Sequence, residues 1–246
     1  MKLKKNKMNN SDEKQIYLHL KNFEKDSISK SDEDIFREVN KFDVKFSGNK
    51  LYIFNINGII INIGSKKKSL KLLYFAIGRL KKLLKKKSSD KLLFDLGNAF
   101  LSIAETKLGH RPKIEDLVKN KEHREARKYF NQISDFNIFP SAATNSGNIL
   151  EKYARNYEAI FMYDEALKIN PNFGMALGNK GIALTYYFNL ISKKNPEIIL
   201  ESRELLKKSL EVENTLEIGG KIAIDNFKKR LDSVEKFIKR INIKKK

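Results

Sequence analysis

The chain has 246 residues, of which 41% are hydrophobic and 10% are aromatic. This apolar share is too large for a disordered chain, and the apolar runs are too short to cross a membrane, so we expect a folded, soluble protein without a membrane partner. Because cysteine is absent, disulfides, thiolate nucleophiles and cysteine-based metal sites are excluded. No apolar segment follows the basic start of the chain, which predicts a cytoplasmic location.

Basic residues outnumber acidic ones by 50 to 30, which gives a formal net charge of +20. Such an excess favours binding to polyanions, although an AT-rich coding bias would also enrich lysine. The densest basic run, 66–89, contains no acidic residue. It is either a solvated helix face or a surface for weak, non-specific contacts with nucleic acid. The residues predicted to touch phosphates are Lys81, Lys82, Lys85, Lys86 and Lys87.

The N-terminal segment, 1–56, is the least regular part of the sequence. Helical patterns alternate with polar stretches between Ser11 and Phe46, which predicts one or two short helices. This segment is therefore expected to be helical or partly irregular.

The stretch 51–63 gives conflicting signals. It is rich in Ile, Tyr and Phe around a central Asn-Gly pair, and local propensity therefore favours a β-hairpin. A repeated spacing that starts here instead makes 57–67 a helix. We follow the spacing because three residues fit it together: Gly64, Ala76 and Leu80.

This spacing recurs through residues 57–213. The segment 145–150 returns at 179–184, 34 residues later, with Asn, Gly and Leu in register. In each unit the glycine is followed by a small residue and then by a large one. The four units are 57–89 (Gly64, Ala76, Leu80), 90–139 (Gly97, Ala126, Phe130), 140–173 (Gly147, Ala159, Tyr163) and 174–213 (Gly181, Ser202, Leu206). The second unit fits only with an insertion at about 106–122, and the fourth with one at about 192–199.

A period of 34 residues with this pattern is typical of the tetratricopeptide repeat (TPR), in which two antiparallel helices pack along one seam. The glycine allows a close approach of the second helix, and the large residue fills the remaining gap. Apolar residues recur at helical spacing over 222–241, which predicts a helix that covers the end of the stack. We therefore predict an all-α, TPR-like α-solenoid of about four helix pairs, followed at 214–246 by a capping helix and a basic tail.

Polar residues recur at two positions on the first helix of each unit. Two residues before the glycine stand Asn62, Asp95, Asn145 and Asn179, and just after it stand Ser65, Asn98, Asn148 and Ile182. Because the two positions are three residues apart, they share a helix face. Amides both donate and accept hydrogen bonds, which suits recognition of a peptide backbone or a terminal carboxylate. The predicted partner-binding residues are Asn98, Asn145, Asn148 and Asn179.

An equally open alternative is that these amides tie neighbouring helices together. In peptide-binding TPR domains similar asparagines grip a C-terminal carboxylate, but the Lys and Arg residues that complete that grip are not at matching positions in this sequence.

One stretch is more specific than a generic repeat: residues 163–184 read YDEALKINPNFGMALGNKGIAL. This run, and 173–184 within it above all, resembles the TPR region of a prokaryotic family in which the array precedes a C-terminal HEPN ribonuclease domain. The likeness extends over about 58–237. That family is associated with phage defence and toxin-like RNA cleavage, so the resemblance implies a place in such a system.

The sequence departs from that family at the nuclease. HEPN ribonucleases carry an Arg followed, after four to six residues, by a His, and none of the three histidines here (His19, His110 and His123) has an Arg at that spacing. The chain also stops where the nuclease domain would start. The resemblance therefore implies an array without its nuclease, and ribonuclease activity is not carried over.

No other catalytic constellation is visible. The glycines near 58–66 miss the spacing of a phosphate-binding loop, and the histidines are scattered singly, so we expect no cofactor and no metal site. The sequence favours a non-enzymatic TPR scaffold that binds another protein or peptide segment. The alternatives are a basic RNA- or DNA-binding accessory protein and a non-catalytic remnant of a HEPN ribonuclease. The oligomeric state stays open.

Overall fold

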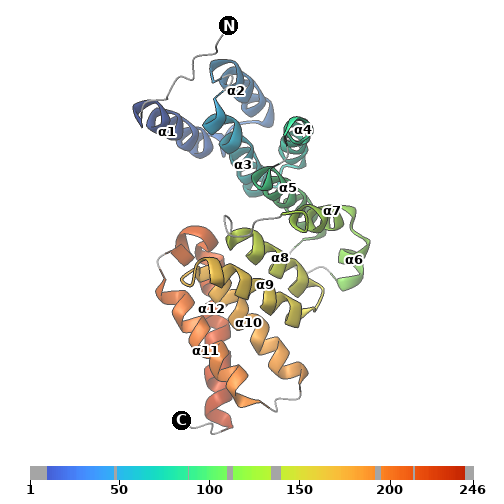
Figure 1. Cartoon of the computed structure of the whole chain (residues 1–246), viewed down its shortest axis with the longest axis vertical. Coiled ribbons are helices and arrows are strands. Elements are labelled where there is room, and N and C mark those ends of the chain that lie inside the picture. The colour runs from blue at the N-terminus through green and yellow to red at the C-terminus, as the bar shows by residue number, and fades with distance from the viewer. Residues whose placement is uncertain are drawn as a thin grey trace. The chain divides into compact units, whose positions relative to one another are not determined.

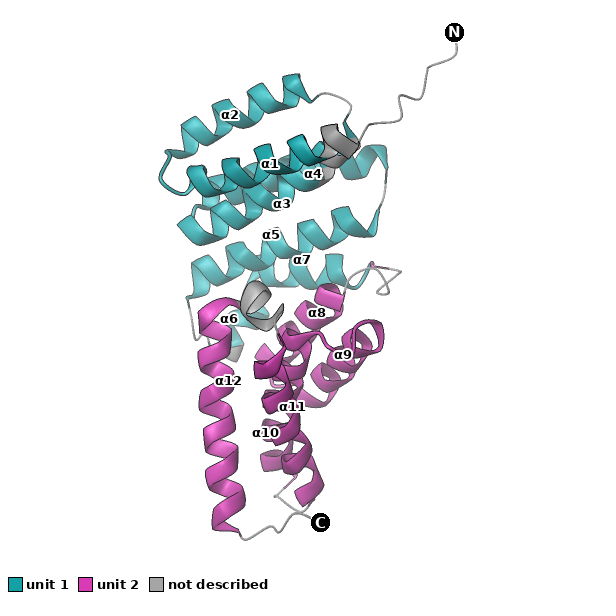
Figure 2. Ribbon diagram, turned by 90° about the vertical axis from the view of Figure 1, so that its left-hand side faces the viewer, with its two compact units in different colours: residues 1–132 teal, residues 133–246 magenta. Residues whose placement is uncertain are grey.

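The computed structural model describes residues 10–46, 49–87, 89–109, 113–133, 140–191, 195–212 and 214–241. Throughout these residues the regular structure is helical, which confirms the predicted all-α fold class (Figure 1). The chain divides into two compact units, 1–132 and 133–246, and each is described by itself (Figure 2). Among the helices described, none combines the length and the apolar character that a membrane crossing requires.

Unit 1 is built from seven helices in the part of it that the structure describes. The pairs are α3 with α4 and α5 with α7. Helix α3 also packs against α1 on one side and α5 on the other. The bounds are α1 (Asn10–Ser27), α2 (Asp32–Lys45), α3 (Lys50–Lys67), α4 (Leu70–Lys86), α5 (Asp90–Leu108), α6 (Ile114–Lys119) and α7 (Lys121–Phe130). The expected insertion at about 106–122 thus includes the short helix α6, and 1–56 includes two helices of full length.

The stretch with conflicting signals folds as the helix α3. It begins at Lys50, after Asn49, whose side-chain oxygen accepts a hydrogen bond from the Tyr52 amide at 3.0 Å. Its apolar residues lie at helical spacing, and Ile56, Ile60 and Ile63 have no exposed surface. Burial of this stripe outweighs the strand propensity of its β-branched residues. The repeat spacing predicts the helix correctly, and local propensity does not.

Serine and asparagine side chains cap most of the other helices in unit 1. Ser31, Ser69, Ser89 and Asn120 each accept a hydrogen bond from a backbone amide in the first turn of the helix that follows. Each cap contributes about 1 kcal/mol to stability, because it satisfies an amide that has no partner within the helix.

The described residues of unit 2 form two helix pairs and a covering helix. The pairs are α8 (Pro140–Lys152) with α9 (Asn156–Ile169), and α10 (Gly174–Leu190) with α11 (Pro196–Glu211). The last helix, α12 (Asn214–Arg240), packs on both α10 and α11. Its Phe227, Val234 and Ile238 enter the core around Phe188 and Leu206. It is the capping helix expected from the sequence.

The helix pairs close on the glycines that define the repeat. A Cβ added to Gly97 would lie 2.5 Å from the Phe130 ring, and one added to Gly147 would lie 2.5 Å from the Tyr163 ring. A Cβ on Gly181 would lie 2.8 Å from Leu206. Each of these three contacts joins the glycine to the large residue that the spacing predicts for it, in the second, third and fourth repeat units.

The first repeat unit, 57–89, differs. Gly64 packs against the side chains of Leu72 and Leu73, and the expected large residue Leu80 is not among its nearest neighbours. The capping helix adds a contact of the same kind that the spacing does not predict, since the Phe227 ring lies over Gly178, too close for any Cβ.

Candidate functional site

The first helices of the pairs form the layer in which the recurrent amides lie. In unit 1 this first-helix layer consists of α3 and α5, and we include α1 in it because α1 packs against α3. In unit 2 it consists of α8 and α10, which also contact each other. The predicted partner-binding residues are divided between the units. Asn98 lies in unit 1, and Asn145, Asn148 and Asn179 lie together in unit 2.

In unit 2 the amides make hydrogen bonds between helices. The Oδ1 of Asn148, on α8, accepts a hydrogen bond from the Nδ2 of Asn179, on α10, at 2.7 Å. The Tyr163 hydroxyl of α9 lies 2.9 Å from the same oxygen and 3.0 Å from a carboxylate oxygen of Glu151. Asn148 therefore links three helices, as the alternative interpretation of the amides predicts. Asn145 and Asn98 are half-buried and also interact within the chain. Their role in binding a partner stays a prediction.

Burial shifts the titration of this polar cluster. It raises the pKa of the Glu151 carboxyl above its ordinary value, although the hydrogen bond from Tyr163 and the charge of Arg230 oppose the shift. Burial likewise raises the pKa of the Tyr163 hydroxyl, and the neighbouring Glu151 charge adds to this effect. The cluster therefore serves as a half-buried structural network, in which the Tyr163 hydroxyl and the Asn179 amide are the donors.

In unit 1 the first-helix layer borders a cavity that solvent can enter. A cavity of about 370 Å³ lies beside α1 and α3, near the start of α5, and we call it the first-helix cavity. Its lining mixes polar and apolar residues: Tyr17, Leu20, Lys21, Glu24, Asn55, Gly58, Ile59, Asn62 and Lys91. Asn62 is the one member that the sequence singles out as a repeat position. It is exposed, and its amide donates a hydrogen bond to Glu24.

A buried carboxyl lies beneath this cavity. Asp95 stands at the position of Asn62 in the next repeat unit, still within unit 1. Its side chain is 4% exposed, and Lys91 donates a hydrogen bond to its Oδ1. Among the described residues no donor reaches its Oδ2. Burial raises the pKa of Asp95, and the charge of Lys91 opposes the rise. Gly58 lies beside this pair, and a Cβ at that position would make only ordinary contacts, 3.8 Å from the Lys91 ammonium.

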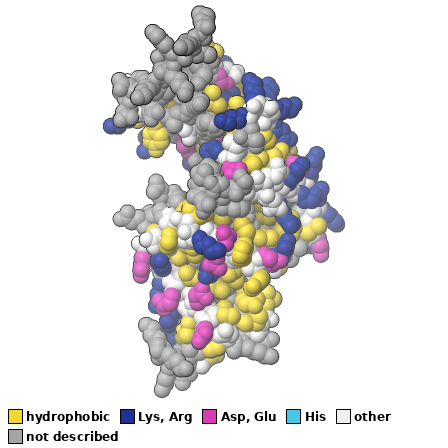
Figure 3. Space-filling view, in the orientation of Figure 1, with side chains coloured by type: hydrophobic (Ala, Val, Ile, Leu, Met, Phe, Trp, Pro, Cys, Tyr) yellow, Lys and Arg dark blue, Asp and Glu magenta, His cyan; other side chains and the backbone are white. Residues whose placement is uncertain are grey.

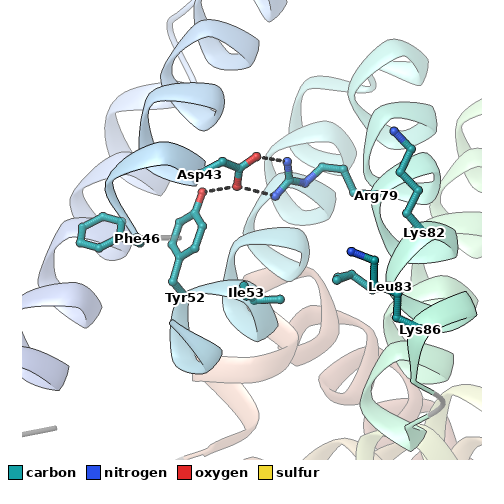
Figure 4. A pocket seen from close by; sticks show the side chains of 8 residues that line it. All are labelled: Asp43, Phe46, Tyr52, Ile53, Arg79, Lys82, Leu83 and Lys86. Carbon is teal, nitrogen blue, oxygen red and sulfur yellow. Dashed lines mark hydrogen bonds and ion pairs between the residues drawn. The ribbon is translucent and has the colours of Figure 1, made fainter. Parts of the chain in front are cut away.

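The five lysines predicted to touch phosphates are all exposed, but the structure divides them. Lys82 and Lys86 line a second cavity, of about 310 Å³, between α2, α3 and α4 (Figure 4). We call it the α4 cavity. Lys81 instead lies over the Phe100 ring, 5.4 Å from its centroid. Lys85 and Lys87 line neither cavity. Only two of the five therefore share a concave site.

The wall of the α4 cavity holds a closed network of hydrogen bonds. Arg79 binds both carboxylate oxygens of Asp43, and its Nε donates to Asn57 at 3.0 Å. The Tyr52 hydroxyl donates to Asp43 at 2.9 Å. Burial alone would raise the pKa of Asp43, but the hydrogen bonds from Arg79 and Tyr52 outweigh it and hold the pKa below its ordinary value. Asp43 is therefore ionised and neutralises Arg79. The sequence shows no sign of this pair, because the partners lie on different helices.

On the face of unit 2 seen in Figure 3, hydrophobic side chains gather over α9 and α10. Tyr157 and Phe161 of α9 are 67% and 58% exposed, and Leu190 of α10 is 67% exposed. The Tyr157 ring lies 5.9 Å from that of Tyr187, which joins the two helices at this surface. The repeat spacing does not single out these residues.

Catalytic and metal sites were not expected from the sequence. Within the described ranges no three His, Asp or Glu residues come together in a way that could hold a metal ion. His19 lies at the surface beside Lys45, and His123 is buried at the start of α7. His110 falls outside the described residues.

The helix pairs, the glycine contacts and the covering helix define a TPR-like helical repeat fold. No protein-family model matches the sequence, and no curated protein matches it either. Among solved structures, the crystal structure of MamA protein is similar to 82% of this chain and 94% of its own, at 18% identity and a TM-score of 0.38. Likeness at this level carries no conclusion about function.

Proposed function

We propose that this protein is a non-enzymatic scaffold that binds another protein through its first-helix layer. The observation that carries the proposal is the first-helix cavity of unit 1, which opens beside a repeat amide, Asn62, on helices with buried apolar stripes. A rigid surface that is already formed binds a peptide segment without a large cost of ordering itself. The cavity is lined by two amides, two ammonium groups and one carboxylate, of which Lys91 already pairs with Asp95 and Glu24 with Asn62, so Lys21 and Asn55 are the polar groups that a partner meets first.

The kind of partner follows from the sequence resemblance alone. The stretch 163–184 resembles repeats that precede HEPN ribonucleases, so a component of a prokaryotic defence or toxin-type RNase system is the partner that we propose. On this proposal the chain itself cleaves no RNA, because none of its histidines has the Arg spacing of that nuclease.

Photo-cross-linking tests the scaffold function. We would place benzoylphenylalanine at Asn62, inside the first-helix cavity, and in a matched protein at Lys128, an exposed residue of the second helix α7. In cells that produce the protein naturally, we expect position 62 to cross-link to one discrete protein and position 128 to cross-link far less. Equal labelling from both positions, or labelling from neither, would overturn the proposal.

Nucleic-acid binding is the second candidate. In the described part of the chain Lys82, Lys85, Lys86 and Lys87 form no ion pair, so their ammonium groups remain available to phosphates. Binding of this kind would be sequence-independent, with a dissociation constant on the order of 10⁻⁴ to 10⁻⁶ M, and would weaken steeply with salt.

A further inference from the structure

The α4 cavity combines an apolar wall with an uncompensated positive rim. Phe46, Tyr52, Ile53 and Leu83 supply the apolar surface, and the rings of Phe46 and Tyr52 lie 5.2 Å apart. The volume of about 310 Å³ exceeds what one large side chain fills, and it lies at the lower end of the range for ligand pockets. An apolar group can therefore enter the cavity and leave water.

The charges around the cavity do not balance. Among the described residues that line it, Asp43 is the only carboxylate, and Arg79 already holds both of its oxygens. Neither α3 nor α4 contains an Asp or a Glu. Lys82 and Lys86 are one helical turn apart on α4, and neither pairs with another described residue. An anion that neutralises these two lysines must come from outside the described part of the chain.

The same geometry selects the class of anion. A phosphate chain is best held by a guanidinium fork, but both outer nitrogens of Arg79 are bound to Asp43. The ionised Asp43 would also repel a phosphate that entered the cavity. A carboxylate at the rim can stay clear of Asp43 while an apolar side chain of the same peptide covers the apolar wall, which a phosphate at the rim would leave exposed. The carboxylate can pair with Lys82 or Lys86 while the lysine stems cover the apolar group.

We infer that the α4 cavity is a second binding site, for an acidic peptide segment that inserts one large apolar side chain between α3 and α4 and pairs its carboxylates with Lys82 and Lys86. This site shares no lining residue with the first-helix cavity. It therefore goes beyond the proposed function, and either site can fail without the other.

The chain offers a matched control for a test. Lys82→Gln with Lys86→Gln removes the two cavity lysines, and Lys81→Gln with Lys85→Gln removes two exposed lysines at the same spacing on the same helix. Both pairs change the net charge equally. A general electrostatic effect therefore acts equally on both, and only a specific site separates them.

The probe is a fluorescein-labelled peptide with Leu-Phe at its centre and three Glu on each side, measured by fluorescence anisotropy at 150 mM salt. We expect the Lys82/Lys86 variant to bind it about tenfold more weakly than the unchanged protein does, and the Lys81/Lys85 variant to stay within about twofold. A peptide with Ser-Ser at its centre tests the apolar half of the site, and it should bind at least about tenfold more weakly.

Three results would overturn the inference. The first is no binding of the Leu-Phe peptide by the unchanged protein, and the second is an equal loss in both lysine variants. The third is undiminished binding of the Ser-Ser peptide. A ten-nucleotide oligothymidylate serves as a further probe, and if it binds more tightly than the peptide, with equal losses in both variants, the lysines form a phosphate-binding run and not a peptide site.

Discussion

The two units use the first-helix layer differently. In unit 2 the side-chain oxygen of Asn148 accepts hydrogen bonds from Asn179 and Tyr163, so this amide joins helices. In unit 1 the corresponding layer has the exposed Asn62 beside a cavity of about 370 Å³. At the repeat position two residues before the glycine, Asn179 of unit 2 is half-buried in a link between α8 and α10, whereas Asn62 of unit 1, which bonds to Glu24 of α1, is exposed at the edge of a cavity. A recurrent polar residue in a helical repeat is thus evidence of a shared geometry, and its role depends on the neighbours that each unit supplies.

The helix contacts provide the largest expected effect. Gly147→Ala in unit 2 would place a Cβ 2.5 Å from the Tyr163 ring, and the ring would have to move within a core where it has no exposed surface. We expect a loss of about 1–3 kcal/mol in the free energy of unfolding. The matched change in unit 1 is Gly78→Ala on the exposed side of α4, where no atom lies within 4 Å. It should gain about 0.5–1 kcal/mol.

Urea denaturation followed by circular dichroism measures both changes. If Gly147→Ala were as stable as the unchanged protein, the α8 and α9 contact would be looser than the structure shows. The spacing of glycines and large residues would then lose its physical basis in unit 2.

The amides give the next largest effect. Asn148→Ala removes the acceptor for the Asn179 amide and one acceptor for the Tyr163 hydroxyl, and because these bonds are part-buried the loss should be about 0.5–1.5 kcal/mol of unfolding free energy. Asn62→Ala, at an exposed position of unit 1, should change stability by less than about 0.5 kcal/mol. Thermal melts of the two variants compare the units directly. An equal loss in both variants would mean that the layer is cohesive in unit 1 as well.

Most of the fold could be predicted from the sequence, because the packing rule is local to each helix pair. Gly97 with Phe130 and Gly147 with Tyr163 are fixed by spacing, even where α6 is inserted between the helices of a pair. The α3 helix also follows from the spacing. Gly64 does not pack as expected, since the position of Leu73 depends on how closely α4 approaches α3, and spacing alone does not determine that distance.

The cavities could not be predicted in the same way. The first-helix cavity requires α1, and the α4 cavity requires α2, and both helices lie in the segment whose pattern is least regular. Part of the signal was present, because Arg79, Leu83 and Lys86 share one face of a helix at spacings of four and three residues. What the sequence could not supply was the partner across the gap, Asp43, which neutralises Arg79 and leaves the lysines uncompensated.

The smallest expected effect is a pH dependence that arises in the polar cluster of unit 2. Burial raises the pKa of Glu151 above the ordinary 4.5, against the hydrogen bond from Tyr163 and the charges of Arg230 and Lys152. The folded protein therefore binds this proton more tightly than the unfolded chain does. This contribution to stability is fully present below pH 4.5, and it is lost as the pH rises through the folded pKa. Glu151→Gln keeps a hydrogen-bonding side chain but cannot ionise. The free energy of unfolding, measured in urea from pH 4 to pH 7, should fall with pH more in the unchanged protein than in this variant. If the two profiles run parallel, Glu151 ionises as freely in the folded state as in the unfolded one, and the cluster around Asn148 is open to water in the way that the first-helix cavity is.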